Sequence, residues 1–528
     1  MIMTNEAEKG MVPVDPSVGA VSTNIKSVEE KEAARLLNPS SNAAERKLKP
    51  GRLTGVLAFS VFAVTLSSFQ FGYHIGCVNA PGGLITEWII QSHSNTFNQT
   101  ITNNEADMAW SVAVAIFAVG GMAGGLLSGW LADKVGRKGG LLYNNLFAFI
   151  AAALMGLSKS VGAYPMIILG RLFIGFNCGL SSGLVPMYLT EVSPINLRGM
   201  LGSFHQLFLT IAILVSQIFG LPSLLGSDEY WPMIFAFTIV PAILQLATLV
   251  FCPESPKYTL AVKGDEPRAE SDLKKLRGSD DVSAELDSMK EEVASANTSE
   301  KPSMASMFSS SLRWPMTIAI MMMLAQQLSG INVAMFYSTI IFKGAGLSTE
   351  QAVYATIGMG AVNVLMTIVS VWLVDHPKFG RRSLLLIGLI GMWFCTIFIV
   401  GALTLNGSTD ATGAVQHPWA SYAAIVGVLL FVVSFACGPG SIPWFFVSEI
   451  FASSVRGNAN SIAVMVNWLA NLVVGLTFLP INNVLHQFSF FVFTFFLSIS
   501  IFFTWRFVPE TKGKTVEEIT AEFENNRR

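Results

Sequence analysis

Charged residues are scarce in this chain of 528 residues, of which 13% are charged and 52% are hydrophobic. The formal net charge is only −2, so the chain has no excess of positive charge with which to bind nucleic acid. It contains no Gly-x-x-x-x-Gly-Lys-Ser/Thr phosphate-binding loop, and no nucleophile, metal-ligand or acid–base cluster stands out in it. We therefore expect neither an enzyme nor an ATP-driven pump, and no cofactor or metal.

Cysteine is also rare, and each cysteine lies within or at the edge of an apolar stretch. The spacing fits neither a disulfide framework nor a metal site, so we interpret the cysteines as small packing residues. The five are Cys77, Cys178, Cys252, Cys395 and Cys437.

The chain is rich in long apolar stretches, and its mean hydropathy is +0.53. A helix that crosses a bilayer needs about 20 predominantly apolar residues. Twelve stretches meet this requirement, which predicts an all-α membrane protein with twelve transmembrane helices and the lipid bilayer as its surroundings. They lie at 53–77, 108–131, 139–157, 162–190, 200–221, 231–252, 314–342, 350–374, 382–405, 419–448, 458–480 and 487–508.

The loops predict the orientation of these spans. An even number of spans puts both ends of the chain on one side, and nearly all Lys and Arg residues outside the spans lie on that side, which identifies it as cytoplasmic. Residues 1–51 are polar and contain several prolines, so we expect a disordered cytoplasmic tail without a cleavable signal peptide. On the other side, the sequon that begins at Asn98 makes this residue a candidate glycosylation site.

The chain repeats itself internally. A Trp-Leu-x-Asp sequence ahead of a Gly-Arg-basic sequence follows both the second and the eighth apolar stretch, and paired Glu and Arg residues recur after the fourth and tenth. The repeat predicts two similar six-helix halves, at 52–252 and 314–508. Between them, residues 253–313 have apolar side chains at near-helical spacing and should form short helices under the bundle. Residues 509–528 should form a cytoplasmic C-terminal tail.

Every repeated charge lies on the predicted cytoplasmic face. Ion pairs that form only when this face is closed would stabilise the closed state alone. We therefore predict an intracellular latch that breaks when the protein opens inward, and charges that merely set the topology are the alternative. The latch candidates are Asp133, Arg137, Glu191, Arg198, Glu254, Glu449, Arg456 and Glu510.

One polar stretch interrupts the seventh apolar run. Between Gln326 and Asn332 it contains two adjacent glutamines, a serine, a glycine and an asparagine. Buried polar groups without partners are costly in a membrane, so they must find hydrogen bonds. They could bond to neighbouring helices, which is common in membrane bundles, or form a midplane site for a neutral, hydroxyl-rich solute. Gly330 would let the helix bend or break there.

Further motifs run in order between about Arg52 and Gly513, namely Phe69-Gln70-Phe71-Gly72-Tyr73, Gly136-Arg137-Lys138, Arg171, Val185-Pro186-Met187-Tyr188, His205-Gln206-Leu207, Pro253-Glu254-Ser255-Pro256, Gly438-Pro439-Gly440, Ile442-Pro443-Trp444, Asn467-Trp468 and Pro509-Glu510-Thr511-Lys512-Gly513. With the stretch from Gln326 to Asn332, they resemble the sugar porter family of the major facilitator superfamily, and specifically its facilitative glucose transporter (GLUT) branch. The resemblance implies a plasma-membrane uniporter of hexoses, with D-glucose as the expected substrate, that works by alternating access.

The resemblance also implies a sugar site. Side-chain amides both donate and accept hydrogen bonds, as sugar hydroxyls do, and indole faces can cover the apolar face of a pyranose. Gly438 and Pro439 give the tenth span a breaking point that could gate its outer side. The implied sugar-binding residues are Gln206, Gln326, Gln327, Asn332, Asn363, Trp444, Asn467 and Trp468.

Three positions depart from the resemblance. Ala436 stands where glucose transporters often carry a glutamate, and Ala325 stands where strict glucose carriers have a serine, so the choice between glucose and broader hexose selectivity stays open. His74 stands where proton-coupled relatives carry an aspartate and facilitative ones an amide, which makes it either a pH-sensitive residue or a packing residue. A proton-coupled hexose symporter and a sugar sensor that does not transport are the alternative functions.

Overall fold

The computed structural model describes residues 50–297, 303–344, 346–406 and 419–515, together with residues 518, 519 and 521. The predicted N-terminal tail, apart from its last two residues, and most of the predicted C-terminal tail lie outside the described residues. The described ranges contain twelve helical spans that are long and apolar enough to cross a membrane, and they contain no β-strand. The prediction of twelve membrane helices is therefore confirmed.

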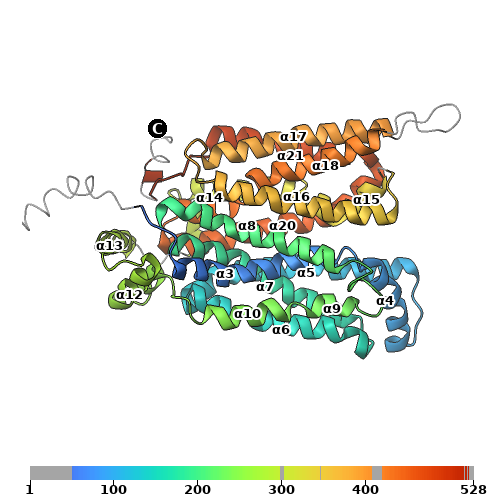
Figure 1. Cartoon of the computed structure of the whole chain (residues 1–528), viewed down its shortest axis with the longest axis horizontal. Coiled ribbons are helices and arrows are strands. Elements are labelled where there is room, and N and C mark those ends of the chain that lie inside the picture. The colour runs from blue at the N-terminus through green and yellow to red at the C-terminus, as the bar shows by residue number, and fades with distance from the viewer. Residues whose placement is uncertain are drawn as a thin grey trace, which may run out of the picture. The chain divides into compact units, whose positions relative to one another are not determined.

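The first half of the bundle is coloured blue to green in Figure 1. Its sixth span is divided into two short helices, and a short 3-10 helix precedes its fifth. The spans are α3 (Gly55–Gly76), α5 (Asn103–Val135), α6 (Arg137–Val161), α7 (Pro165–Val192), α8 (Arg198–Phe219, after η1, Ile195–Leu197) and the pair α9 (Trp231–Ala236) and α10 (Ile239–Leu249).

The second half is coloured from yellow to red and lies beside the first. Two of its spans are broken, the first and the fourth. The spans are α14 (Arg313–Leu328) with α15 (Ile331–Gly344), α16 (Thr349–Leu373), α17 (Arg381–Asn406), α18 (Trp419–Cys437) with α19 (Ile442–Ile450), α20 (Ser453–Leu485) and α21 (Phe490–Phe507, after η3, His486–Ser489).

Local sequence explains where several helices begin and break. The second span of each half starts with a capping box, Thr102 with Glu105 for α5 and Ser348 with Gln351 for α16, in which each side chain bonds the other residue's backbone N–H. The break between α14 and α15 falls at Gly330, whose φ of +90° is a conformation that glycine adopts without strain. The break predicted at this glycine is therefore confirmed.

The two halves meet mainly through two helix pairs, α5 with α20 and α8 with α16. Smaller contacts join α7 with α20 and α19, α8 with α19, and α3 with α15. These pairs combine spans 1, 2, 4 and 5 of the first half with spans 7, 8, 10 and 11 of the second. Polar side chains on these eight spans can therefore face the other half, whereas α6, α10 and α17 pack chiefly on helices of their own half.

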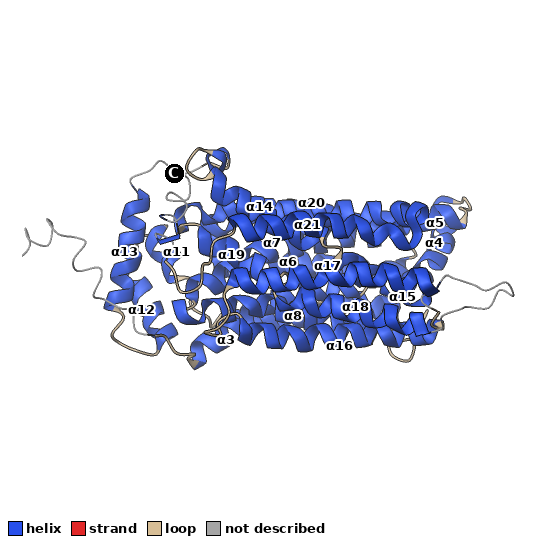
Figure 2. Ribbon diagram, turned by 90° about the horizontal axis from the view of Figure 1, so that it is seen from above, coloured by secondary structure: helices blue, strands red, loops and turns tan. Residues whose placement is uncertain are grey.

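The segment between the halves forms α11 (Pro256–Ala261), α12 (Glu266–Arg277), α13 (Ser283–Asn297) and η2 (Ala305–Phe308), as its apolar spacing predicts. Leu273, Leu286 and Met289 pack together in a small core of their own. Arg277 donates to the Val192 carbonyl at the end of α7, over 2.8 Å, which attaches these helices to one end of the bundle. Figures 1 and 2 both show α12 and α13 at that end.

The opposite end carries a helix that the sequence did not predict. The stretch after the first span was expected to be a loop, but it includes α4 (Gly82–Phe97), which is amphipathic and packs on α5. Asn98 follows it directly and is exposed. Below, the end of the bundle that carries Arg137, Glu191 and Arg456 is called the charged end, and the end that carries α4 is called the opposite end.

Candidate functional site

A network of uncharged amides lies at the middle of the second half. Asn467 on α20 donates to Gln326 Oε1 over 2.8 Å and accepts from Gln327 Nε2 over 3.0 Å. Asn332, at the start of α15, donates to Gln327 Oε1. All four side chains are buried, and among the described residues no charged side chain takes part in this network. The structure therefore brings together four of the eight residues predicted to bind a sugar.

The broken spans supply backbone acceptors to the same network. The Gly438-Pro439-Gly440 sequence interrupts the helix between α18 and α19, so its carbonyl groups are not all used within a helix. Gln326 Nε2 lies 3.1 Å from the Pro439 oxygen and 3.0 Å from the Gly440 oxygen. A helix broken at two glycines thus lets an amide on one span bond to the backbone of another.

Aromatic rings flank the amides from both halves. Phe71 on α3 touches both predicted tryptophans, with ring centroids 5.1 Å from Trp468 and 6.4 Å from Trp444. Trp468 also lies against Gly121 of α5, where a Cβ atom would come within 2.3 Å of the indole. The glycine therefore provides the space in which the indole from the other half fits. Phe71 was not predicted as a site residue, although it lies in one of the quoted motifs.

His205 was not predicted as a site residue either, although it precedes Gln206 in a quoted motif. Its ring centroid is 5.2 Å from that of Trp444, and its Nδ1 lies 2.8 Å from Ser68 Oγ. His205 therefore links α3 and α8 of the first half to the tryptophan on α19.

The two remaining predicted residues form no hydrogen bond with the network among the described residues. Gln206 on α8 is buried and faces the break in the tenth span, with its Nε2 3.4 Å from the place a Gly440 Cβ would occupy. Asn363 on α16 is also buried, and its Oδ1 has no hydrogen-bond partner among the described residues. Gln206 therefore lies beside the broken tenth span, and Asn363 keeps an unused acceptor on α16.

This arrangement suits a neutral ligand with several hydroxyl groups. In the present arrangement the amides largely satisfy one another, so the cost of burying them is already met. A hydroxyl group both donates and accepts, and can replace an amide–amide bond without leaving a polar atom unpaired. Because no charged side chain belongs to the network, an ion would find no counter-charge there.

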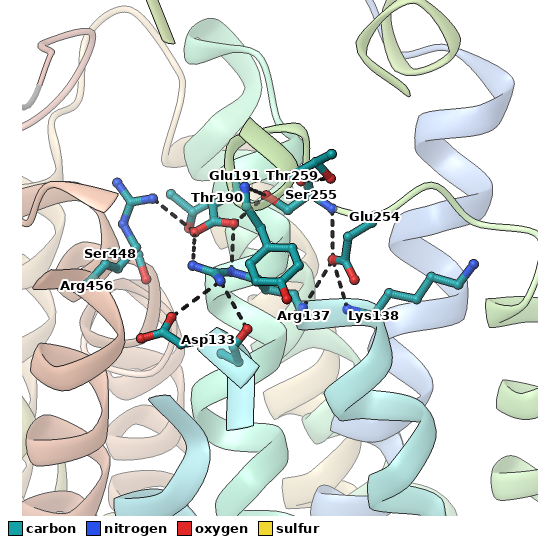
Figure 3. A network of polar contacts seen from close by, with 12 residues as sticks. Asp133, Arg137, Lys138, Thr190, Glu191, Glu254, Ser255, Thr259, Ser448 and Arg456 are labelled. Atoms are coloured by element: carbon teal, nitrogen blue, oxygen red, sulfur yellow. Dashed lines mark hydrogen bonds and ion pairs between the residues drawn. The ribbon is translucent and has the colours of Figure 1, made fainter. Parts of the chain in front are cut away.

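The charged end of the first half contains a second, ionic network, drawn in Figure 3. Arg137 binds both carboxylate oxygens of Glu191, over 2.9 and 3.0 Å, and is 3.6 Å from Asp133. Glu254 accepts hydrogen bonds from the backbone N–H groups of Arg137 and Lys138. Burial raises the pKa of the Glu254 carboxyl, against the opposing effect of the backbone N–H groups of Ser255 and Lys138 and of the Arg137 charge.

The second half repeats this ionic network with equivalent residues. Arg381 lies 3.0 Å from Asp375 and 3.4 Å from Glu449. Glu510 accepts from the backbone N–H of Arg381 over 2.8 Å, and Thr511 donates to Glu449 over 2.7 Å. The internal sequence repeat therefore corresponds to a repeated three-dimensional arrangement of charges.

Two contacts join the halves across the charged end. Arg456 of the second half lies 3.3 Å from Glu191 of the first, and both side chains are almost completely buried. Asp375 accepts a hydrogen bond of 2.6 Å from the backbone N–H of Met200. Arg198, by contrast, forms no ion pair with Glu449 among the described residues. The crossing ion pair thus combines the Glu of the first repeated Glu and Arg pair with the Arg of the second.

His74 lies away from both networks, inside the first half. It is completely buried, with Nε2 2.6 Å from Thr238 Oγ1 and Nδ1 3.6 Å from Cys77 Sγ. The guanidinium of Arg171 donates to the His74 carbonyl oxygen over 3.1 Å. Both ring nitrogens therefore have partners that do not require a charged imidazole.

Comparison with known proteins places this geometry in a family. The sugar (and other) transporter family model matches residues 60–523. Facilitated glucose transporter protein 1 of Caenorhabditis elegans is 70% identical over 477 residues, which cover 90% of this chain and 92% of that protein.

Solved structures of one transporter show the same fold. The major facilitator superfamily proton:xylose symporter XylE, bound to 6-bromo-6-deoxy-D-glucose, superposes with a TM-score of 0.76 at 28% identity and covers 89% of this chain and 100% of its own. The inward-open conformation of XylE from E. coli gives a TM-score of 0.64 at 26% identity, covering 88% and 99%. The present conformation is therefore nearer to the sugar-bound structure than to the inward-open one.

Glu191→Gln should open the charged end, because it leaves the buried guanidiniums of Arg137 and Arg456 without their carboxylate. Breaking a buried ion pair by removing one partner costs about 3–5 kcal/mol. Spin labels at Lys134 and Lys378, which are exposed on different halves, would report the separation by pulsed electron paramagnetic resonance. We expect the variant to add a population with a longer distance.

Glu270→Gln on α12 is the matched control for this experiment. The Glu270 side chain is 41% exposed and pairs only with the surface residue Lys274 among the described ion pairs, and an exposed ion pair contributes about 0–1 kcal/mol. Its distance distribution should stay close to that of the unmodified protein. A Glu191→Gln distribution that also stays unchanged would contradict the latch.

Proposed function

This chain belongs to the sugar (and other) transporter family, in its facilitative glucose transporter branch, and from that premise we propose that it carries D-glucose across the membrane passively. The observation that carries this proposal is the network of Gln326, Gln327, Asn332 and Asn467. It is neutral, it is buried, and it lies where broken helices leave backbone carbonyls free. Each of these properties suits a hexose, which carries several hydroxyl groups and no charge.

Weak binding is the expected consequence of such a site. A neutral hydrogen bond contributes about 0.5–1.5 kcal/mol net, and immobilising the sugar offsets part of the sum. The dissociation constant should therefore be on the order of millimolar. A carrier benefits from this, because it must release its cargo on the other side.

Alternating access explains why the two networks lie where they do. We propose that the charged end is cytoplasmic and that both termini lie on that side of the plasma membrane. The crossing pair of Arg456 with Glu191 then closes the inner side, and it breaks when the site opens inward. The glycines that interrupt the tenth span allow α18 and α19 to move separately and to gate the outer side.

Passive transport, rather than coupling to protons, is supported by the surroundings of His74. A proton-coupled carrier needs a group that changes charge during its cycle. His74 has partners for both ring nitrogens, and its neighbour Arg171 would oppose a positive imidazole. We propose that His74 stays neutral and packs the interior of the first half.

Uptake of labelled D-glucose by proteoliposomes that contain only this protein tests the function. We expect saturable uptake of D-glucose and none of L-glucose. Gln327→Leu should raise the KM for D-glucose about 3–10-fold, as expected from the loss of roughly one or two neutral hydrogen bonds. Gln91→Leu makes the same chemical change on exposed α4 and should leave the KM unchanged.

Stereospecific binding of D-glucose without any flux would contradict the transport proposal and favour a sensor. Equal KM values for the unmodified protein and Gln327→Leu would contradict the assignment of the amide network as the substrate site. Competition by fructose would show how far the selectivity extends beyond glucose, which bears on Ala325 and Ala436.

His74→Asn tests the passive mechanism through its pH dependence. Asparagine is uncharged at every pH, so the variant can be compared with the unmodified protein between about pH 5 and 8, the range in which a free histidine titrates. Because His74 is proposed to stay neutral, the pH profile of glucose uptake should be the same in both proteins. A pH dependence that is present in the unmodified protein and absent from His74→Asn would contradict this.

A further inference from the structure

One buried amide remains unexplained by the central network. Gln217 on α8 is 5% exposed, and neither its Nε2 nor its Oε1 has a hydrogen-bond partner among the described residues. Most buried amides in this protein are bonded, as the network around Gln327 illustrates. Buried amides are normally hydrogen-bonded, so this one needs a polar partner, such as water or a solute, that the described residues do not supply in the present arrangement.

The Gln217 side chain points across the boundary between the halves. Its Oε1 lies 2.2 Å from the place that a Cβ would occupy on Gly360 of α16, and Leu214 lies beside the same glycine. The helices α8 and α16 are one of the main contacts between the halves. Here this contact around Gln217 and Gly360 is called the α8–α16 seam. Glycine at this position leaves the space into which the amide fits when the seam is closed.

The seam lies between the opposite end and the centre. Gln217 is in the last turn of α8, eleven residues beyond Gln206, which corresponds to about 16 Å along the helix. On α16, Asn363 is one turn nearer the charged end than Gly360, and its Oδ1 is also unpaired. Unpaired amide atoms thus extend from near the opposite end toward the predicted site.

The halves are also in contact at the opposite end. Asn79 in the loop after α3 donates a 2.7 Å hydrogen bond to the Met335 carbonyl on α15, which joins the two halves at this end. At the α8–α16 seam the Gln217 amide fits against Gly360, and its polar atoms are buried from solvent. Opening the opposite end must separate α8 from α16 there and expose the amide to whatever enters.

We propose that Gln217 is an outer hexose contact, which binds hydroxyl groups of the sugar while the seam is open and loses them when it closes. This inference rests on the proposed transport of D-glucose. A neutral amide at this place can exchange water for hydroxyl groups without a change in charge, so it attracts the same cargo as the central amides. Because Gln217 binds the sugar only while the seam is open, it favours binding from the opposite end. It does not add to the affinity of the central site once the seam has closed.

Gln217 should contribute most to the affinity for a sugar that enters from the opposite end but is too large for the seam to close over it. Maltose contains a glucose unit but is twice the size, so it is used here as an external competitor of D-glucose uptake in proteoliposomes. Gln217→Met has nearly the same shape without the amide, and it should raise the inhibition constant of maltose about 3–10-fold. Leu214→Met changes packing in the same seam without removing a polar group, and it should leave the constant within about twofold.

A second measurement separates a lost hydrogen bond from a shifted conformational equilibrium. Removing an unpaired amide could stabilise the closed seam, which would weaken every external competitor by the same factor. Deoxy-D-glucoses that each lack one hydroxyl are therefore compared as external inhibitors. If Gln217 binds a particular hydroxyl, the analogue that lacks this hydroxyl should have the same inhibition constant in Gln217→Met as in the unmodified protein. The analogues that keep the hydroxyl should inhibit the variant more weakly than the unmodified protein.

An unchanged inhibition constant for maltose, or one common factor for all the analogues, would overturn the outer contact. Gln217→Leu serves as the second variant if Gln217→Met does not fold. Failure of the unmodified protein to take up D-glucose would overturn the proposed function itself, and the outer hexose contact with it. If the unmodified protein takes up D-glucose and Gln217→Met has the same inhibition constant for maltose, the outer contact alone is overturned.

Discussion

The hydrogen-bonding demand of uncharged amides inside a membrane determines the centre of this structure. Gln326, Gln327, Asn332 and Asn467 cannot be left unpaired in an apolar surrounding, so they bond to one another and to carbonyls from a broken helix. The breaks in turn need glycine, at Gly330 and around Pro439. Under the proposed function, these amide–amide bonds are the ones that a sugar would replace with bonds to its hydroxyl groups.

The charged residues act at a different place and in a different way. They are excluded from the amide network and gather at one end, where the same arrangement of Arg, Glu and Asp occurs in each half. The pair of Arg456 with Glu191 and the hydrogen bond from Met200 to Asp375 cross between the halves, whereas Arg137 with Glu191 and Arg381 with Glu449 pair within one half. Under the proposed transport cycle, opening the charged end has to break the contacts that cross.

The sequence predicted what depends on local pattern. Hydropathy gave the twelve spans, the repeat gave the two halves, and Gly330 gave the break in the seventh span. It did not predict the contacts between distant segments. Three features depend on how the spans pack: the crossing pair of Arg456 with Glu191, the unpaired amides of Asn363 and Gln217, and the position of Phe71 against two tryptophans. The helix α4 was missed because its short amphipathic pattern lies in a loop next to a strong membrane span.

The central claim is that a neutral site carries the sugar without an energy source. Its most direct test is the steady-state concentration of D-glucose inside proteoliposomes that contain this protein alone, with an imposed proton gradient. The account predicts equal concentrations of D-glucose inside and outside, whether or not the gradient is present. Accumulation above the outside concentration that follows the gradient and collapses with it would contradict the account.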